Sequence, residues 1–295
     1  MKVLNERLGI QASSLALLTA TLWGGNQIAI KLGLGGIPPV ALAGIRFALG
    51  GLTVLAWALL IRIPLRLAPG ERQALLWLVL LFITQIYLLN AGTQFTLAGR
   101  STIFISTYPF FTAAFAHLFI PGDRLSRLKV AGMALSFAGV ALIFAEGLAL
   151  GEFRYLLGDA MVLTSGLLLG ARQVYTKRLT QGIHPSRLLL WQAALSLPVF
   201  ALLSAAFERH IPWRLSSEII GGILYQGLVI AGFCFILQTS LLRRYRASRL
   251  SVFGFLTPIV GVLMSHILLD EGISSGLLGS MLLVGAGIAI VNYES

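Results

Sequence analysis

Charged residues are scarce in this sequence. Only 11% of its 295 residues are Asp, Glu, Lys or Arg, compared with about a quarter in soluble domains, and 57% are hydrophobic. A soluble protein of this composition would expose so much apolar surface that it would aggregate. Disordered chains are polar and poor in aromatic residues, so disorder is excluded as well. The composition therefore predicts a polytopic membrane protein.

Cysteine and the side chains of catalytic sites are also few. Cys234 is the single cysteine, so the chain has no disulfide framework. The sequence shows no metal-ligand cluster, no Ser/His/Asp set and no paired carboxylates in the middle of an apolar run. This argues against an intramembrane enzyme and against a metal or cofactor. A channel would need a continuous polar path or rings of charge, which the pattern does not provide.

Long apolar runs are abundant. A membrane-spanning helix needs about 20 mostly apolar residues, and ten segments meet this requirement. They leave no room for a soluble catalytic domain. The predicted spans are residues 12–32, 39–61, 73–94, 102–119, 128–145, 158–177, 186–207, 218–241, 250–269 and 273–291.

Basic residues outnumber acidic ones by 22 to 11. On a soluble protein this excess would indicate nucleic acid, but in a membrane protein Lys and Arg gather in cytoplasmic loops. Fifteen of the 22 lie in loops on the side of the N-terminus and five on the opposite side, while Arg46 and Arg172 fall inside spans. The distribution predicts that both termini are cytoplasmic, and it disfavours nucleic acid as a partner.

The two halves of the chain resemble each other at polar, glycine and proline positions, which is typical of an internal repeat. An offset of 149 places Phe104, Pro109 and His117 on Phe253, Pro258 and His266. An offset of 146 pairs Gly24, Gln27, Lys31 and Pro39 with Gly170, Gln173, Lys177 and Pro185.

Each half holds five predicted spans, and because five is odd, the second half must cross the membrane in the opposite sense. The predicted fold is all-α, with ten transmembrane helices in two inverted five-helix repeats. The repeats are residues 1–146 and 158–295, joined by a periplasmic connector at 147–157. Inverted repeats are typical of secondary transporters, which bind substrate near mid-membrane between the repeats. We therefore expect a carrier of small molecules that works by alternating access.

Several short motifs follow one another along the chain: Trp23-Gly24-Gly25-Asn26, Arg46-Phe47, Tyr108-Pro109, Gly122-Asp123-Arg124-Leu125, Gly158-Asp159, Pro258 and Asp270-Glu271-Gly272. With them the chain resembles the drug/metabolite transporter superfamily, specifically its EamA-type permeases, over nearly its whole length. Asp123 departs from the pattern, since the family more often has Glu there. Within the family the chain is most similar to bacterial inner-membrane amino-acid exporters of the YddG type. That resemblance implies aromatic and neutral amino acids as substrates, and efflux of other metabolites or drugs stays open.

Polar side chains inside the predicted spans are candidates for a substrate site, because such groups usually face a bundle interior or a water-filled cavity. Hydrogen bonding between helices is the alternative. On the first span, Trp23, Asn26 and Gln27 share one face; a second polar face, on the third span, consists of Thr84, Tyr87, Asn90 and Gln94. The other substrate-binding candidates are Arg46, Ser106, Tyr108, Gln192, Tyr225, Phe253 and Thr257.

Pro109 and Pro258 occupy equivalent positions within two spans. A proline inside a helix removes a backbone hydrogen bond and bends the chain, so both are candidate hinges, with a packing kink as the alternative. His117 and His266 are the only groups within spans that titrate near neutral pH. No Asp or Glu lies mid-span, so we expect weakly coupled or facilitated transport, with the histidines as proton-linked candidates. Small-residue seams favour packing within a monomer, or a weak dimer.

Overall fold

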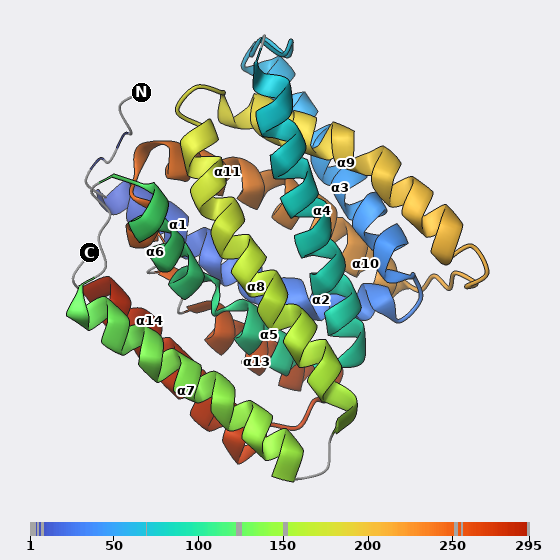
Figure 1. Cartoon of the computed structure of the whole chain (residues 1–295). Coiled ribbons are helices and arrows are strands. Elements are labelled where there is room, and N and C mark those ends of the chain that lie inside the picture. Colours follow the sequence, from blue (N-terminus) through green and yellow to red (C-terminus); the bar gives the residue numbers. More distant parts are fainter. Residues whose placement is uncertain are drawn as a thin grey trace.

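The computed structural model describes residues 4, 6, 9–68, 70–121, 126–149, 153–250, 253–254 and 256–293. Within these residues the fold is entirely helical, without a strand (Figure 1). The apolar runs predicted to cross the membrane are helices. The all-α class is therefore confirmed.

Four of the ten predicted spans consist of more than one helical segment. In chain order the spans are α1 (Ile10–Gly24) with α2 (Asn26–Leu34), α3 (Pro39–Leu60), α4 (Glu71–Phe95), α5 (Ala98–Ile105) with α6 (Tyr108–Phe119), α7 (Arg127–Ala149), α8 (Phe153–Leu179), α9 (Pro185–Phe207), α10 (Ser217–Leu224) with the π-helix η1 (Tyr225–Cys234) and α11 (Phe235–Arg244), α12 (Ala247–Leu250) with α13 (Leu256–Leu269), and α14 (Ser275–Tyr293). Helices α7 and α8 both extend into the predicted connector at 147–157, so that the chain between them is shorter than predicted.

The outer surface of the bundle is apolar. Leu60, Leu202 and Ile267 are each more than 70% exposed, as expected for side chains that face lipid. In the described part of the chain, five segments are long and apolar enough to cross a membrane by themselves: Pro39–Leu60, Glu71–Phe95, Ala98–Phe119, Pro185–Phe207 and Ser217–Arg244. Helix α8 is more polar because it carries Asp159, Arg172 and Lys177, and the first span is interrupted at Gly25.

Helices α7 and α14 pack against each other with opposite chain directions. The Ser136 hydroxyl donates to the Val284 carbonyl at 3.2 Å, and the Ser280 hydroxyl donates to the Gly139 carbonyl at 2.6 Å. A step forward along α7 is thus a step backward along α14, and Figure 1 shows the two side by side at one edge of the bundle. The fifth helices of the two halves are therefore antiparallel, as inverted repeats require.

A second contact shows the same internal symmetry. Gly24 of α1 and Gly170 of α8 are equivalent at an offset of 146, and each touches another helix without an intervening side chain. A Cβ on Gly24 would lie 2.6 Å from the Cβ of Val260, and one on Gly170 would lie 2.6 Å from the Cβ of Phe111. Val260 and Phe111 are themselves equivalent at an offset of 149. The same helix contact therefore occurs twice, each time between a glycine of one half and a helix of the other.

Substituting Gly170 with alanine should destabilise the protein. Alanine is the better helix former by about 0.5–1 kcal/mol, but its methyl group would also lie 2.8 Å from the backbone nitrogen of Thr112. Overpacking of this kind costs about 1–3 kcal/mol. Gly221→Ala is the control, because nothing lies within 4 Å of a Cβ there. Thermal unfolding should show a lower midpoint for Gly170→Ala only; equal midpoints would contradict the close contact.

The two candidate hinge prolines lie at the start of helices, not in helix interiors. Pro109 is the second residue of α6, which follows a break at Ser106–Thr107, and Pro258 is the third residue of α13. In the first turn of a helix the backbone N–H has no helical partner, so proline fits there without loss of a hydrogen bond. The expected mid-helix bend is thus a break between two helices. A hinge role for the prolines stays a prediction.

Candidate functional site

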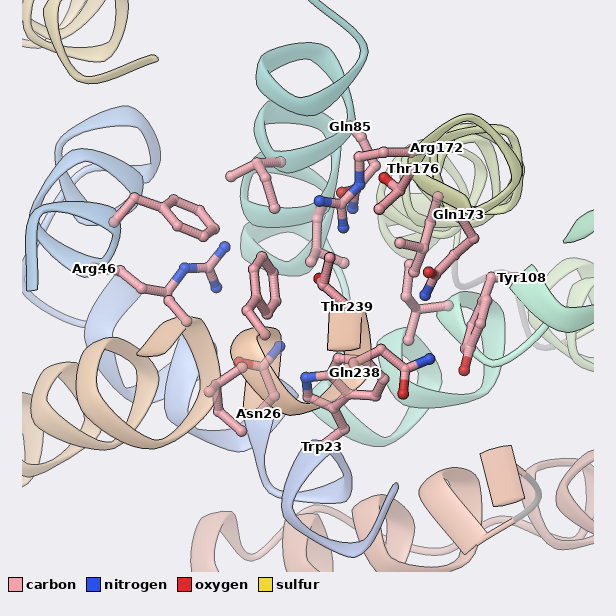
Figure 2. A pocket seen from close by; sticks show the side chains of 18 of the residues that line it. Trp23, Asn26, Arg46, Gln85, Tyr108, Arg172, Gln173, Thr176, Gln238 and Thr239 are labelled. Atoms are coloured by element: carbon pink, nitrogen blue, oxygen red, sulfur yellow. The ribbon is translucent and has the colours of Figure 1, made fainter. Parts of the chain in front are cut away.

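A cavity of about 90 Å³ lies inside the bundle, between the two halves of the chain, with room for several water molecules. Its walls come from α1, α2, α3, α4 and the break between α5 and α6 on one side, and from α8, α9, η1, α11 and α13 on the other. Figure 2 shows polar side chains from both halves around the central space.

Equivalent residues of the two repeats line this cavity. Fourteen of the lining residues form seven pairs at the repeat offsets of 146 and 149, so equivalent positions of both halves meet here. The pairs are Trp23 and Leu169, Asn26 and Arg172, Gln27 and Gln173, Arg46 and Gln192, Ile86 and Phe235, Leu89 and Gln238, and Tyr108 and Thr257. The cavity is therefore the place where the two repeats face each other.

Two arginines supply all the charge among the described lining residues. Arg46 is 2% exposed, and its Nη1 donates to Oε1 of Gln226 at 3.3 Å. Its guanidinium also lies 4.5 Å from the ring centre of Phe47. Arg172, on α8, lies over the ring of Phe82 at 5.1 Å. The Nε atom of each arginine is buried without a hydrogen-bond partner.

Several buried amide oxygens at the cavity also lack a hydrogen-bond partner. They are Oδ1 of Asn26, Oε1 of Gln27 and Oε1 of Gln85. The amide nitrogen of Gln85 is fixed by a bond to the hydroxyl of Ser165 at 2.9 Å. A buried polar atom without a partner is rare in proteins. These oxygens can accept hydrogen bonds from an ammonium or hydroxyl group of a ligand.

Aromatic rings form the apolar part of the wall. Trp23 meets Phe235 edge-to-face at 6.4 Å between ring centres, and Phe47 lies 5.8 Å from Phe235. The cavity thus combines cationic groups and amide oxygens with apolar surface. Polar groups set among apolar side chains are typical of sites for small molecules.

At one end of the cavity, a hydrogen-bond network joins the halves. Lys31 donates to the carbonyl oxygens of Thr93 at 3.0 Å and Thr96 at 2.5 Å. The Thr96 hydroxyl donates to Asp159 at 2.5 Å, and Arg100 forms a two-point ion pair with the same carboxylate, at 3.1 and 2.5 Å. Asp159 belongs to the second half of the chain, and the other residues of this network belong to the first: Lys31, Thr93, Thr96 and Arg100. Charge-assisted contacts thus hold the two halves together here.

The opposite end is tied by Lys177, which is the repeat equivalent of Lys31. Its ammonium donates to the carbonyl oxygens of Leu4 at 2.6 Å and Tyr245 at 2.8 Å. Tyr245 is itself equivalent to Thr96 at an offset of 149. Lys177 follows Asp159 by 18 residues on α8, which at 1.5 Å per residue places the two ends about 27 Å apart. Two related sets of contacts thus flank the cavity along α8.

No group of three or more metal-ligating side chains occurs among the described residues. The site is a cavity lined by polar and aromatic side chains of both repeats.

Comparison with known proteins agrees with this arrangement. The profile of the EamA-like transporter family matches the chain twice, at residues 11–145 and 156–293. The chain belongs to the EamA-like transporter family. The double match also agrees with the internal repeat, and the prediction of a transporter in place of an enzyme is confirmed.

Relatives of this transporter cover nearly its whole length. A "Probable amino-acid metabolite efflux pump" of Salmonella typhimurium is 29% identical over 94% of this chain and 93% of its own. The "Uncharacterized transporter YvbV" of Bacillus subtilis is 30% identical over 95% of this chain and 92% of its own. A solved crystal structure superposes with a TM-score of 0.74 at 20% identity, covering 96% of this chain and 98% of the other, and shows the shared fold.

Eight of the predicted substrate-binding residues of the transporter line the cavity. The polar face of the first span is among them, as are one residue each from α3, α6, α9 and α13 and one from the break before α6. They are Trp23, Asn26, Gln27, Arg46, Ser106, Tyr108, Gln192 and Thr257.

The polar face predicted on the third span does not line the cavity. Thr84, Tyr87 and Gln94 are exposed on the outside of α4, Tyr87 by 45%. Asn90 is buried, but its amide donates to the carbonyl of Pro39 at the start of α3. The face of α4 that meets the cavity instead consists of Gln85, Ile86 and Leu89. Asn90 therefore corresponds to the alternative of hydrogen bonding between helices.

Four other candidates also lie away from the cavity lining. The Tyr225 hydroxyl donates to the Leu22 carbonyl at 2.5 Å, and Phe253 packs against the apolar cluster that includes Ala12 and Leu241. His117 and His266 are exposed near the ends of α6 and α13, and Nδ1 of His266 lies 3.0 Å from the Glu271 carbonyl.

The sequence-based candidate list missed several polar lining residues, namely Gln85, Arg172, Gln173, Thr176, Gln238 and Thr239. The repeat offset was the signal that could have found one of them, because Gln173 is the equivalent of Gln27. The offset could also have predicted that Arg172 lines the cavity, since the equivalent of Arg172 is the cavity candidate Asn26. Gln85 has no such marker, because its equivalent in the second half is Cys234.

Proposed function

We propose that this transporter exports small metabolites that carry a carboxylate, with amino acids as the leading class, across the bacterial inner membrane. The observation that carries the proposal is the combination of a buried guanidinium, Arg46, with unpartnered amide oxygens of Asn26 and Gln27 in one cavity between the repeats. An amino acid offers the complementary groups, a carboxylate and an ammonium.

Each part of an amino acid has a partner of suitable chemistry. A carboxylate accepts charge-assisted hydrogen bonds from the Arg46 guanidinium, which has a free Nε. An ammonium donates to amide oxygens such as that of Asn26. An apolar or aromatic substrate side chain would lie against Trp23 and Phe235. The name of the Salmonella relative, a probable amino-acid metabolite efflux pump, supports both the substrate class and outward transport.

We further propose that the two repeats alternate in opening the cavity, with Lys31 and Lys177 at the two closures. Transport by this route requires that both ends are never open together, and two related sets of contacts about 27 Å apart provide that separation. The loop charges support cytoplasmic termini. In that orientation the Lys177 end faces the cytoplasm and the Lys31 end faces the periplasm.

Counterflow in proteoliposomes tests the proposed function. Vesicles loaded with an unlabelled amino acid should accumulate the labelled one, with equal pH on both sides because the described lining contains no Asp, Glu or His. Trp23→Ala should reduce the rate at least tenfold, since it removes most of the apolar wall beside Asn26. Trp77→Ala, at a 57% exposed position on the outer surface of α4, is the control.

Two results would overturn the proposal. One is the absence of counterflow for every amino acid tested while the protein remains folded. The other is normal counterflow in Trp23→Ala at normal expression, which would place the substrate elsewhere.

A further inference from the structure

Both arginines of the cavity point into the same space. Arg46 comes from α3 of the first half and Arg172 from α8 of the second. Figure 2 shows their guanidinium groups turned toward the middle of the cavity from opposite sides. A chain of contacts through two aromatic rings joins them: Arg46 lies 4.5 Å from the ring centre of Phe47, Phe47 lies 4.6 Å from Phe82, and Phe82 lies 5.1 Å from Arg172. Both arginines therefore line one cavity, from opposite halves of the chain.

Neither arginine faces a carboxylate in the described lining of the cavity. Arg46 has the neutral amide of Gln226 and the ring of Phe47, and Arg172 has the rings of Phe82 and Phe235. Two other arginines of this chain, Arg100 and Arg187, are paired with Asp159 and Glu71. The two cavity arginines thus differ from Arg100 and Arg187, because no carboxylate of the described lining faces them.

The repeat symmetry shows that arginine is not needed to fill these positions. The equivalent of Arg46 is Gln192, and the equivalent of Arg172 is Asn26, and both amides line the same cavity. Symmetry alone would therefore accept a neutral amide at each place. In this chain each of the two positions instead holds an arginine, so two positive charges lie on opposite walls of the cavity.

A buried charge is unfavourable unless it is paired. Contact with an aromatic ring offsets only part of this cost, so a ligand that brings the missing negative charge is favoured. A neutral amino acid is a zwitterion and adds no net charge to the cavity. A molecule with one more acidic group supplies a carboxylate to the second arginine.

Resting on the function proposed above, we propose that the preferred ligand of the cavity carries two acidic groups, one for Arg46 and one for Arg172, as a dicarboxylic amino acid does. The amide oxygens of Asn26 and Gln27 remain as acceptors for its ammonium. Organic cations are disfavoured by the same two charges. The substrates implied by the family resemblance, aromatic and neutral amino acids, should bind more weakly.

Acid and amide pairs of equal size test this directly. The full chain, purified in detergent in a chloride buffer free of phosphate, sulfate and carboxylates, is titrated with glutamate against glutamine and with aspartate against asparagine at equal ionic strength. Thermal stabilisation gives an apparent Kd for each. The acid should bind at least tenfold more tightly than its amide. Equal or tighter binding of the amide would overturn the inference while leaving amino-acid transport in place.

Substitution of Arg172 tests whether this arginine causes the preference for the acid over the amide. Arg172→Gln should reduce the acid-over-amide ratio to below about threefold, and Arg172→Lys should restore part of it because the charge returns. Arg209→Gln, which removes an exposed arginine after α9, should leave the ratio unchanged. A full preference in Arg172→Gln would contradict its role. If neither acids nor amides bind or show counterflow, the proposed function itself fails.

Discussion

Asp159→Asn is expected to lower the free energy of unfolding by about 3–5 kcal/mol, the range seen when one partner of a buried ion pair is removed. Asp159 is fully buried and accepts hydrogen bonds from Arg100 and from the Thr96 hydroxyl. Asparagine keeps the size of the side chain but removes the negative charge that faces the Arg100 guanidinium. The loss also acts between the halves, because Asp159 belongs to the second and both partners to the first.

Two further variants separate this effect from a general loss of charge. Asp270→Asn removes an acid that is exposed and has a left-handed φ of 54°, which asparagine tolerates well; its stability should stay within about 0.5 kcal/mol of the parent. The double variant Arg100→Gln/Asp159→Asn should recover part of the loss, because no unpaired charge remains. Denaturant or thermal unfolding measures all three. If Asp159→Asn were as stable as Asp270→Asn, the ion pair between Arg100 and Asp159 would contribute nothing to stability.

Substitution of the two equivalent lysines is expected to shift the transporter in opposite directions. Lys31→Met and Lys177→Met keep most of the length of the side chain and remove the charge that holds backbone carbonyl oxygens at each end. Hydrogen bonds from charged groups contribute about 1.5–3 kcal/mol each. Each variant should therefore open its own end more often, so Lys177→Met should expose the cavity to the cytoplasm and Lys31→Met to the periplasm.

The readout is labelling of a single thiol in the cavity. Cys234 is the single native cysteine, so Cys234→Ser with Ser106→Cys gives one probe in the cavity wall. A membrane-impermeant thiol reagent, added from one side at a time, should react several-fold faster from opposite sides in the two lysine variants. Arg178→Met, at the exposed position next to Lys177, is the control and should behave as the parent. The same direction of change in both lysine variants would contradict the two-ended closure.

The fold could be predicted because polar and proline positions repeat at constant offsets. Gly24 and Gly170 matched in the sequence because the same helix contact needs a glycine in each half. The odd number of spans then required inversion. What the offsets could not show was that the prolines start new helices, since Pro109 and Pro258 are compatible with a bend or with a first turn.

The candidate site was predicted well on the first span and poorly on the third. A polar side chain in a membrane helix can face a cavity or hydrogen-bond a neighbouring helix, and the sequence does not distinguish the two. Asn90 illustrates this, because its partner is the Pro39 carbonyl, which lies 51 positions earlier in the chain. Gln85 was missed for the converse reason: it is a single amide on a face that otherwise reads as apolar.

Arg172 shows how depth affects interpretation. It lies only a few residues from the end of its span, so a cytoplasmic position for its long side chain was compatible with the sequence. In the structure the guanidinium turns inward over Phe82 and Phe235. The site's second charge therefore depends on a side-chain direction that no sequence pattern contains.

The cavity between the two inverted repeats should be reached alternately from the two sides of the membrane. The most direct measurement is labelling of the Ser106→Cys probe in the Cys234→Ser protein with both lysines intact, from each side in turn. We predict reaction from both sides, and slower reaction from both when a transported amino acid is bound. Reaction from one side alone under all conditions, or no protection by any transported substrate, would contradict the account.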